Sequence, residues 1–578
     1  MPIEKRWILR PEGDAVVTQR LADELSVDGV LANLLVQRGI TTFDEAHAFF
    51  RPQLDRLHDP FLMKDMDKAV ERINQAILGG EKIMVYGDYD VDGTTAVSLV
   101  YSFLRKIHPR KVSYYIPDRY SEGYGISYKG IDTAKEQGIT LVIVLDCGIK
   151  ANEKIAYAKS QGIDFIVCDH HLPGDVIPDA VAVLDPKRID CTYPFTDLSG
   201  CGVGFKMLQA FCLVNDIPYT EIYSLLDLLA VSIASDIVPV TGENRILAFY
   251  GLKQLNENPR KGLKAIVKLS GLEHHKIGID DIVFKIGPRI NAAGRMESGR
   301  AAVDLLISES EESAMGFGQA INVHNNDRKN VDRHITQEAI AMVEGNAREC
   351  EKKATILYNP NWHKGVIGIV ASRLIEKFYK PTIVLTNSNG FITGSARSIP
   401  GFDLYQAIES CVDLLENFGG HTYAAGLTLK ESNLPQFRAR FEEIASTNIT
   451  EDMMIPQVDI DSELDFKQIT PKFFRILKQF QPFGPGNMSP VFLTQNVYDN
   501  GNGRAVGHGG GHLKLELIQE NEPYRPISAI AFNQSEHFEH LNGGNPIDIC
   551  YSIAENYYRG IANVQLRIKD IKPQDIIL

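Results

Sequence analysis

Five short apolar runs in residues 79–240 alternate with helical patterns, and this alternation limits the possible folds more than any other feature. The runs occupy residues 83–86, 112–116, 141–145, 165–168 and 181–184. Apolar residues recur with helical spacing between them, at 94–107, 128–137 and 152–161. Continuous apolar strands separated by helices indicate an α/β domain whose parallel sheet is covered on both faces.

Acidic residues directly follow several of these runs. Parallel sheets bind ligands at the carboxyl ends of their strands, so these residues are candidates for one shared site. Three like charges within five residues raise one another's pKa values unless a counter-charge lies among them. A divalent cation is a natural counter-charge, although an isolated Asp-x-Asp-x-Asp is more commonly a solvated loop. The residues are Asp88, Asp90 and Asp92 after the first run, Asp146 after the third, Asp169 with His170 and His171 after the fourth, and Asp236 after the apolar stretch 225–234.

Length and composition bound the class of protein. A chain of 578 residues is too long for one hydrophobic core, so we expect three or four domains. No apolar run approaches the roughly 18 residues of a membrane span, and the first seven residues lack the apolar core of a secretion signal. Eight cysteines without a Cys-x-x-Cys pair predict reduced packing residues in a cytoplasmic protein. The net charge of −14 argues against coating duplex DNA by bulk charge, but not against a local phosphate site.

The pattern changes along the rest of the chain. Residues 1–78 are predicted to be mainly helical. Residues 241–348 are helical, with a glycine-punctuated loop at 287–296 and a long connecting helix at 308–343. A smaller α/β domain follows at 349–455, with strands at 355–358, 382–385 and 391–395 and helices at 366–378 and 404–418. Period-two alternation in residues 456–578 predicts an antiparallel β-barrel of the OB type, a fold often used to hold single strands.

Several segments carry a family resemblance when they are taken in order. Asp-Tyr-Asp-Val-Asp-Gly at 88–93, Leu-Asp-Cys-Gly at 145–148, Asp-His-His at 169–171 and Ser-Asp at 235–236 resemble the four motifs of the DHH phosphoesterase superfamily. Gly-Ser-Ala-Arg-Ser at 394–398 and Gly-Gly-His at 419–421 resemble its partner domain, DHHA1. Segments 287–296, 363–373 and 482–487 are similar to a narrower group, the RecJ single-strand exonucleases. Each motif is weak by itself, and the ordered combination is specific.

The resemblance implies a centre of two Mn²⁺ or Mg²⁺ ions, a pairing that suits metal-assisted phosphodiester hydrolysis. Asp146 would bridge the ions and His171 would face the phosphate. Many superfamily members have a histidine where this chain has Tyr86, a poor divalent ligand, so Asp88 is the candidate that completes the first ion. For His170 taken alone, a structural role is about as common as a ligand role. The implied metal ligands are Asp90, Asp92, Asp146, His170 and Asp236, and the implied catalytic residues are Asp146, His171 and Asp88.

Basic and small residues of the later motifs are the implied substrate contacts. Glycine and serine beside an arginine let backbone amides approach phosphate oxygens closely. For any single arginine the alternative is a surface ion pair. The implied substrate-binding residues are Arg289, Asn291, Arg295, Arg373, Ser395, Arg397, Gly420 and His421.

The resemblance implies a metal-dependent exonuclease that degrades single-stranded DNA from the 5′ end to mononucleotides, in DNA repair and recombination. Its implied partners are single-stranded DNA, a helicase and a single-strand-binding protein, with no membrane, and the chain is expected to be a monomer. One alternative is a DHH–DHHA1 phosphodiesterase for oligoribonucleotides or cyclic dinucleotides, although such small substrates need neither the helical N-terminus nor the β domain. A second alternative is a non-catalytic DHH-fold single-strand-binding protein, which the complete carboxylate set disfavours.

Overall fold

The computed structural model describes residues 4–296, 298–520, 522–558 and 561–574. They divide into two compact units. Unit 1 comprises the described parts of Met1–Leu57, Pro239–Thr241 and Pro456–Leu578. Unit 2 comprises His58–Val238 and Gly242–Ile455. Among the described residues, no helix is both long enough and apolar enough to span a bilayer.

The first sheet of unit 2 is parallel, with strand order β3-β2-β4-β5-β6. The predicted runs are confirmed as strands to within one residue at each end. The strands are β2 (Ile83–Gly87), β3 (Val112–Tyr115), β4 (Leu141–Leu145), β5 (Asp164–Cys168) and β6 (Ala182–Leu184). The helices around them are α4 (Met66–Leu78), α5 (Val91–Ile107), α6 (Tyr128–Glu136), α7 (Asn152–Ser160), α8 (Gly200–Val214) and α10 (Leu226–Asp236).

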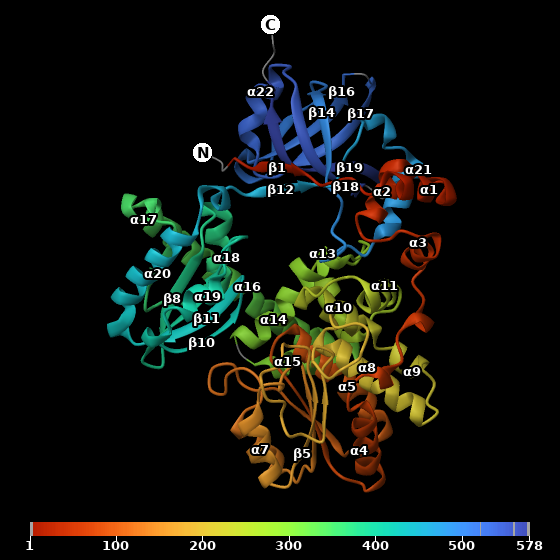
Figure 1. Cartoon of the computed structure of the whole chain (residues 1–578), viewed down its shortest axis with the longest axis vertical. Coiled ribbons are helices and arrows are strands. Elements are labelled where there is room, and N and C mark those ends of the chain that lie inside the picture. Colours follow the sequence, from red (N-terminus) through yellow and green to blue (C-terminus); the bar gives the residue numbers. More distant parts are fainter. Residues whose placement is uncertain (1–3, 297, 521, 559–560, 575–578) are drawn as a thin grey trace. The chain divides into compact units, whose positions relative to one another are not determined.

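Alternate residues of these strands point to opposite faces, so each face has its own apolar layer. Met84, Val142 and Val167 share a core with α6 and α7. The opposite face packs against α4, α5 and α8, and Figure 1 shows α7 and α4 on opposite sides of β5. The strand ends are in register, because Gly87 pairs with Leu145 and Leu145 pairs with Cys168. The acidic residues that follow therefore emerge side by side along one edge.

Helices connect this sheet to the second one. They are α11 (Gly242–Glu257), α12 (Lys261–Leu269), α13 (Ile279–Asp281), η3 (Ile282–Ile286), α14 (Gly287–Met296), α15 (Gly299–Leu306) and the long α16 (Glu311–Glu344). The predicted connecting helix is confirmed as α16. The predicted loop at 287–296 is wrong, because this segment is α14. Gly294 lies within the predicted loop, but a Cβ there would lie 2.6 Å from Tyr89 O, so this glycine serves close packing.

The second sheet of unit 2 has strand order β10-β11-β9-β8-β7, with β7 and β8 parallel and the other neighbours antiparallel. The prediction of one helix at 404–418 is wrong in its second half, where residues 415–421 pair with β11 as a strand and carry the Gly-Gly-His motif. Its elements are β7 (Thr355–Tyr358), α18 (Ile367–Phe378), β8 (Thr382–Ser388), β9 (Phe391–Arg397), α19 (Leu404–Glu409), β10 (Leu415–His421), β11 (Ala424–Leu429) and α20 (Leu434–Asn448), preceded by α17 (Ala347–Glu351).

Unit 1 is built on a closed five-stranded barrel, in which β16 pairs with both β17 and β14. Among the described pairings that close the barrel, all are antiparallel except β17 with β19. The main elements are β14 (Phe492–Asp499), β16 (His512–Gln519), β17 (Glu522–Ala531), β18 (Ile547–Tyr558), β19 (Ile561–Pro573), α21 (Pro471–Leu477) and α22 (Phe538–Asn542).

The N-terminal segment belongs to the same unit as the barrel. Leu21, Leu31 and Leu34 are buried in one core with the barrel residues Phe492 and Leu515. A strand that the sequence pattern did not indicate, β1 (Arg6–Leu9), pairs with β12 (Gln457–Ile460). The segment's helices are α1 (Ala15–Leu25), α2 (Gly29–Val36) and α3 (Phe43–Phe50). Two segments more than 400 residues apart in the sequence therefore fold together.

Candidate metal centre and phosphate site

The acidic edge of the first sheet forms a compact ligand cluster. His170 is 5% exposed, and its Nε2 lies 3.1 Å from Asp146 Oδ1, 3.6 Å from Asp236 Oδ2 and 3.8 Å from Asp92 Oδ2. Two overlapping groups could each hold an ion: Asp146, His170 and His171, and Asp92, His170 and Asp236. The structure thus brings together five of the residues that the sequence singled out.

Local backbone geometry aims these side chains. Asp146 has φ 61°, a left-handed conformation that aspartate tolerates better than most residues, and its amide donates to Cys168 O. The N-terminus of α8 abuts it, where a Cβ on Gly200 would lie 2.6 Å from Asp146 Cβ. Asp90 caps α5 by accepting from Gly93 N. Asp92 accepts from Gly200 N at 2.6 Å, Cys201 N at 2.9 Å and Ser232 Oγ at 2.7 Å.

The electrostatics of the cluster favour a bound cation. Burial and then Asp92 and Asp90 raise the pKa of Asp236 to about 8, and burial followed by the same carboxylates raises the pKa of Asp146. Burial, followed by neighbouring carboxylates, also raises the pKa values of Asp88 and Asp90. Asp88 Oδ2 and His170 Nδ1 are buried without a hydrogen-bond partner, and Asp146 Oδ1 and His170 Nε2 contact only each other, at 3.1 Å and without the geometry of a hydrogen bond. Buried polar atoms are normally paired, so these orphaned atoms, all oxygen or imidazole nitrogen, fit divalent cations.

The pKa values of the two histidines shift in opposite directions. Burial lowers the pKa of His170, which favours the neutral imidazole that a metal requires. For His171, burial opposes protonation, but the hydrogen bond to Asp169 and its charge outweigh burial and raise the pKa. His171 Nδ1 lies 2.7 Å from Asp169 Oδ1, and the same carboxyl group accepts from the amides of Ile149, His170 and His171. Asp169 therefore holds the whole Asp-His-His turn.

Asp88 and Tyr86 lie behind this cluster. Asp88 is 1% exposed and belongs to neither of the two ligand groups found among the described residues. The Tyr86 hydroxyl donates to Gly125 O at 3.0 Å and accepts from Ser127 N at 3.1 Å, and its ring packs in the apolar core. Tyr86 thus fixes the following loop rather than facing the ligands. Asp236 ends helix α10, so the apolar stretch before it is a helix and not a strand.

Two residues of the site, Tyr124 and Asp185, were not predicted from the sequence. Tyr124 donates to Asp146 O at 3.1 Å, and its oxygen lies 3.4 Å from His171 Nε2. Asp185 follows Leu184, which pairs with Cys168, so it occupies the next position along the acidic edge. Asp185 Oδ2 has no partner, and burial raises the pKa of this carboxyl to about 7. The rule that acidic residues follow strands would have found Asp185, whereas Tyr124 lies in a loop with no such rule.

A cluster of arginines forms a second, cationic site within unit 2. Burial, followed by Arg119, Arg328 and Arg397, lowers the pKa of Arg295 to about 10. Arg328 in turn experiences the charge of Arg373. The one acidic side chain that we find in ion-pair contact with the described members of this cluster is Asp332, 2.8 Å from Arg373. Five interacting arginines with one ion-paired carboxylate among the described residues fit a bound polyanion.

Neighbouring groups complete the cationic site. Arg397 Nη1 donates to Ser395 Oγ at 3.1 Å and to Ala396 O at 2.8 Å. A Cβ on Gly368 would lie 2.9 Å from Ser395 Oγ, so the first turn of α18 approaches these side chains closely. The backbone amides of a helix N-terminus favour anions there. Arg119 lies over the Tyr89 ring at 4.9 Å, on the first acidic motif, and Arg295 donates to Gly365 O.

The remaining predicted substrate contacts lie in different parts of unit 2. His421, at the end of β10, experiences the charges of His171, Lys150 and Lys187, so it lies near the metal-ligand cluster. Gly420 has φ 150°, and a Cβ there would lie 2.3 Å from Ala424 O. Arg289 is engaged by Asn322 Oδ1, Lys285 O and Leu269 O within the helical region. Asn291 is half-buried on the same helix, α14.

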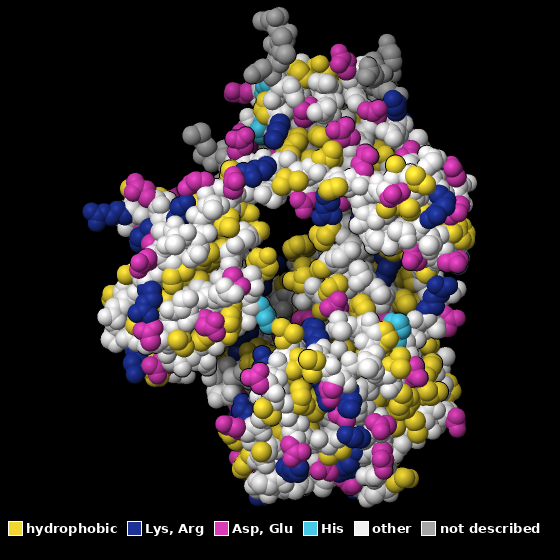
Figure 2. Space-filling model, in the orientation of Figure 1, with side chains coloured by type: hydrophobic (Ala, Val, Ile, Leu, Met, Phe, Trp, Pro, Cys, Tyr) yellow, Lys and Arg dark blue, Asp and Glu magenta, His cyan; other side chains and the backbone are white. Residues whose placement is uncertain are grey.

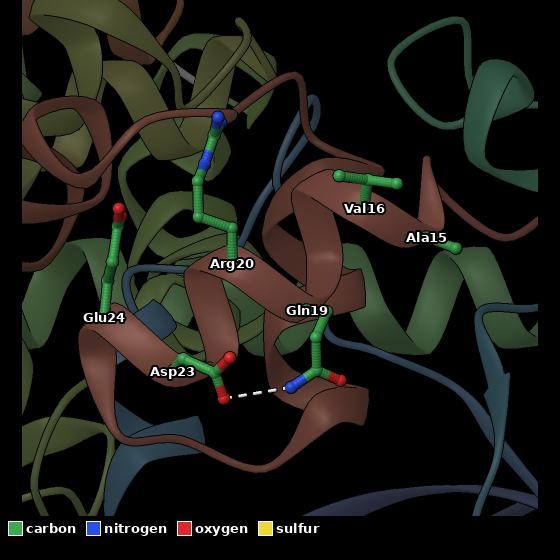
Figure 3. A pocket seen from close by; sticks show the side chains of 6 residues that line it. All are labelled: Ala15, Val16, Gln19, Arg20, Asp23 and Glu24. Carbon is green, nitrogen blue, oxygen red and sulfur yellow. Dashed lines mark hydrogen bonds between the residues drawn. The ribbon is translucent and has the colours of Figure 1, made fainter.

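Surface features away from these sites are less informative. A depression of about 560 Å³ lies over α1 and is lined by Ala15, Val16, Gln19, Arg20, Asp23 and Glu24 (Figure 3). All six residues come from one exposed helix, and Gln19 donates to Asp23. On the face of unit 2 shown in Figure 2, acidic and basic side chains are interspersed. The net charge of −14 is therefore not gathered into one field on that face.

A parallel sheet with an acidic, histidine-bearing edge, joined by a long helix to a mixed sheet with a basic site, defines a phosphoesterase of the DHH class. Family models match in the same order: "DHH family, N-terminal domain" at residues 82–233, "DHHA1 domain" at 351–447 and "RecJ OB domain" at 460–570. The chain belongs to the RecJ family of single-stranded-DNA-specific exonucleases.

Three relatives support this assignment. The chain is 38% identical to the RecJ exonuclease of Bacillus subtilis over 98% of this chain and 70% of that protein. It is 32% identical to the RecJ exonuclease of Salmonella typhimurium over 99% of this chain and all of that protein. The crystal structure of Thermus thermophilus RecJ in complex with Mn²⁺ superposes with a TM-score of 0.83 at 25% identity, covering 99% of this chain and 80% of that one.

Proposed function

We propose that this protein is a metal-dependent exonuclease that hydrolyses single-stranded DNA from the 5′ end to mononucleotides. The observation that carries this function is the presence, within one unit, of buried ligand atoms without partners and an arginine cluster without matching carboxylates. The buried ligand atoms favour bound cations, and the arginine cluster favours a bound anion. A phosphodiester chain with divalent metal ions satisfies both.

Mn²⁺ or Mg²⁺ ions would be held by Asp90, Asp92, Asp146, His170 and Asp236. Carboxylates with one imidazole suit these ions better than an all-histidine set would. When bound, a pair of such ions activates water and stabilises charge on the phosphate oxygens. Other residues of the chain orient the groups that face the substrate. Asp169 orients His171 toward substrate, and the Tyr124 hydroxyl connects His171 to the backbone of Asp146.

The arginine cluster binds the 5′-terminal phosphate. Arg397 and Ser395 offer a guanidinium and a hydroxyl, and Arg295 and Arg119 add charge nearby. A terminal phosphate carries more charge than an internal diester, so a planar guanidinium with neighbouring donors favours it. His421 contributes from β10 near the metal ligands. Arg289, whose donors are engaged inside the protein, supports the helical region instead.

The barrel provides a second binding surface for single-stranded DNA. A groove of about 430 Å³ lies beside α21, β17 and β19. It combines the apolar Ile469, Phe474 and Val564 with the basic Arg475 and Arg525. Apolar surfaces contact bases while cations contact phosphates, without a need for sequence. Because duplex DNA must be opened before a single-strand exonuclease can act, a helicase and a single-strand-binding protein would supply the substrate, in DNA repair and recombination. The chain would act as a cytoplasmic monomer with free cysteines.

Digestion of one oligonucleotide labelled separately at each end tests the function. As DNA, it should lose its 5′ label first, as mononucleotide, and only with Mn²⁺ or Mg²⁺. The RNA version and a cyclic dinucleotide should be cleaved far more slowly. Preferred cleavage of either would favour the alternative phosphodiesterase. Binding without cleavage of any substrate would favour the non-catalytic alternative.

Removal of the barrel is expected to weaken binding to long oligonucleotides more than hydrolysis of very short ones. The deletion must also remove residues 1–57, because deletion of 456–578 alone would expose Leu21, Leu31 and Leu34. In a fragment of residues 58–455, the dissociation constant for a long oligonucleotide should be at least about tenfold higher than in the full chain. The salt dependence of binding should also be weaker in the fragment. Equal losses on short and long substrates by a folded fragment would assign the barrel a purely structural role.

A further inference from the structure

Two buried serines connect the N-terminus of helix α8 to the metal-ligand candidate Asp92. Ser199 is the N-cap residue of α8, and its Oγ accepts from Gly202 N at 3.1 Å. The Oγ atoms of Ser199 and Ser232 lie 2.6 Å apart, and Ser232 Oγ donates to Asp92 Oδ1 at 2.7 Å. Both serines are 0% exposed. Because Asp92 lies on α5 and Ser232 on α10, these contacts join three helices at one carboxylate.

The directions of the hydroxyl protons follow from the chemistry of the groups. A carboxylate that binds a metal ion has no proton, so Asp92 only accepts and the single proton of Ser232 points toward it. Ser199 must therefore donate in its contact with Ser232, while its own oxygen accepts from Gly202 N. All protons in this series point toward Asp92. Hydrogen bonds aligned in this way polarise and strengthen one another.

The hydrogen bonds to Asp92 leave only one of its oxygens open. Oδ1 accepts from Ser232 Oγ and from Cys201 N, which occupies both lone pairs of that atom. Among the described residues, Oδ2 accepts one hydrogen bond, from Gly200 N at 2.6 Å. Oδ2 also lies 3.8 Å from His170 Nε2, within one of the two candidate ligand groups. Turning Oδ1 toward an ion would break two buried hydrogen bonds, so the carboxylate is held in one orientation.

We propose that Ser232, assisted by Ser199, is a positioning residue that holds Asp92 as a one-oxygen ligand and so sets the affinity of the site for its divalent ion. This inference rests on the proposed metal centre and gives a role to two side chains outside the ligand set. A ligand that is already fixed loses little conformational freedom when the ion binds. Groups that orient metal ligands typically contribute about 10- to 100-fold to metal affinity.

Calorimetric titration of Mn²⁺ into the full-length protein without DNA tests this role. Ser232→Ala should weaken the binding of one Mn²⁺ ion about 10-fold. Ser199→Ala should weaken it only about 2- to 3-fold, because Ser232 can still donate to Asp92. In the double variant, loss of Ser199 should add no further weakening, since its effect on the ion passes through Ser232. Ser232→Cys keeps a weak donor and should lie between wild type and Ser232→Ala.

A matched control separates metal positioning from the burial of a serine. Ser98 is also 0% exposed and lies on α5 with Asp92, but its Oγ donates to Thr94 O. Ser98→Ala should therefore bind Mn²⁺ as wild type does. A purely structural role for Ser232 predicts instead that Ser232→Ala lowers the Tm in chelator and leaves Mn²⁺ binding unchanged.

Turnover adds an independent measurement. At saturating Mn²⁺, kcat of Ser232→Ala should stay within about 3-fold of wild type, while the Mn²⁺ concentration for half-maximal hydrolysis rises with the Kd. Unchanged Mn²⁺ affinity in Ser232→Ala, or additive effects of the two serines on that affinity, would overturn the inference. If Ser232→Ala does not fold, unchanged Mn²⁺ affinity in Ser232→Cys would do so. Failure of wild type to bind Mn²⁺ would instead overturn the proposed metal centre, and this inference with it.

Discussion

Replacing Asp146 with asparagine is expected to lower turnover on single-stranded DNA by more than ~10³-fold, because even outer-shell changes at metal sites cost 10- to 100-fold. Asp146 Oδ1 lies 3.1 Å from His170 Nε2, and Asp146 is only 2% exposed, so a ligand lost here cannot be replaced by bulk water. Asparagine is the informative change, since it tolerates φ 61° whereas alanine would add backbone strain. Binding of DNA should largely survive, because the arginine cluster is untouched.

The same variant should be more stable than wild type without metal. Burial and then Asp92 raise the pKa of Asp146, so the folded state binds a proton more tightly than the unfolded state does. Its contribution to the free energy of unfolding therefore falls as pH rises above the ordinary aspartate range, and asparagine removes that loss. With a chelator, the Tm of Asp146→Asn should exceed that of wild type at pH 8 and approach it near pH 4.

The effect of Mn²⁺ on the Tm, and a control variant, test whether Asp146 acts through the metal. Mn²⁺ should raise the Tm of wild type by mass action, and should raise that of Asp146→Asn less. Asp216→Asn is a matched control, because Asp216 is exposed and has φ 52°. It should change neither turnover nor the Mn²⁺ effect. Hydrolysis close to the wild-type rate by folded Asp146→Asn would refute the proposed bridging role.

Replacing Arg397 with alanine is expected to raise KM for a 5′-phosphorylated oligonucleotide about 10- to 100-fold, the range of charge-assisted hydrogen bonds, with a smaller change in kcat. Arg397 donates to Ser395 Oγ and Ala396 O, and its charge acts on Arg295. Loss of this guanidinium should therefore reduce the preference for 5′-phosphate over 5′-hydroxyl ends. Arg397→Lys should be intermediate, since it keeps the charge and loses the planar fork.

The comparison requires kcat/KM on both kinds of end for each variant. Arg440→Ala is a suitable control, because Arg440 lies on α20 of the same domain and pairs with the exposed Asp413. An unchanged preference ratio with both rates reduced together would mean that Arg397 acts on the scissile phosphate or on folding, and end recognition would be abandoned.

Local patterns predicted the catalytic sheet well. Each strand of that sheet is a short apolar run, and its boundaries depend mainly on neighbouring residues. Local patterns were less reliable where a glycine allows close packing inside a helix instead of forming a loop. Gly294 was read as part of a loop, but it lies in α14 because tight packing against Tyr89 excludes a side chain there. The helix predicted through residues 404–418 ends early for a related reason, since pairing with β11 overrides local helical spacing.

The sequence alone determined which residues could hold metal, because the acidic residues follow apolar runs and the strand-helix alternation brings those ends to one edge. Only the tertiary structure decided which atoms of these residues remain without hydrogen-bond partners. It also decided that the Tyr86 hydroxyl bonds to Gly125 and Ser127 instead of facing the metal ligands, and that Ile237, after Asp236, has a left-handed conformation. It also decided that Arg119 and Arg328 join Arg295, and that the N-terminal segment completes the barrel's core. These outcomes depend on contacts between residues far apart in the chain, which no local periodicity encodes.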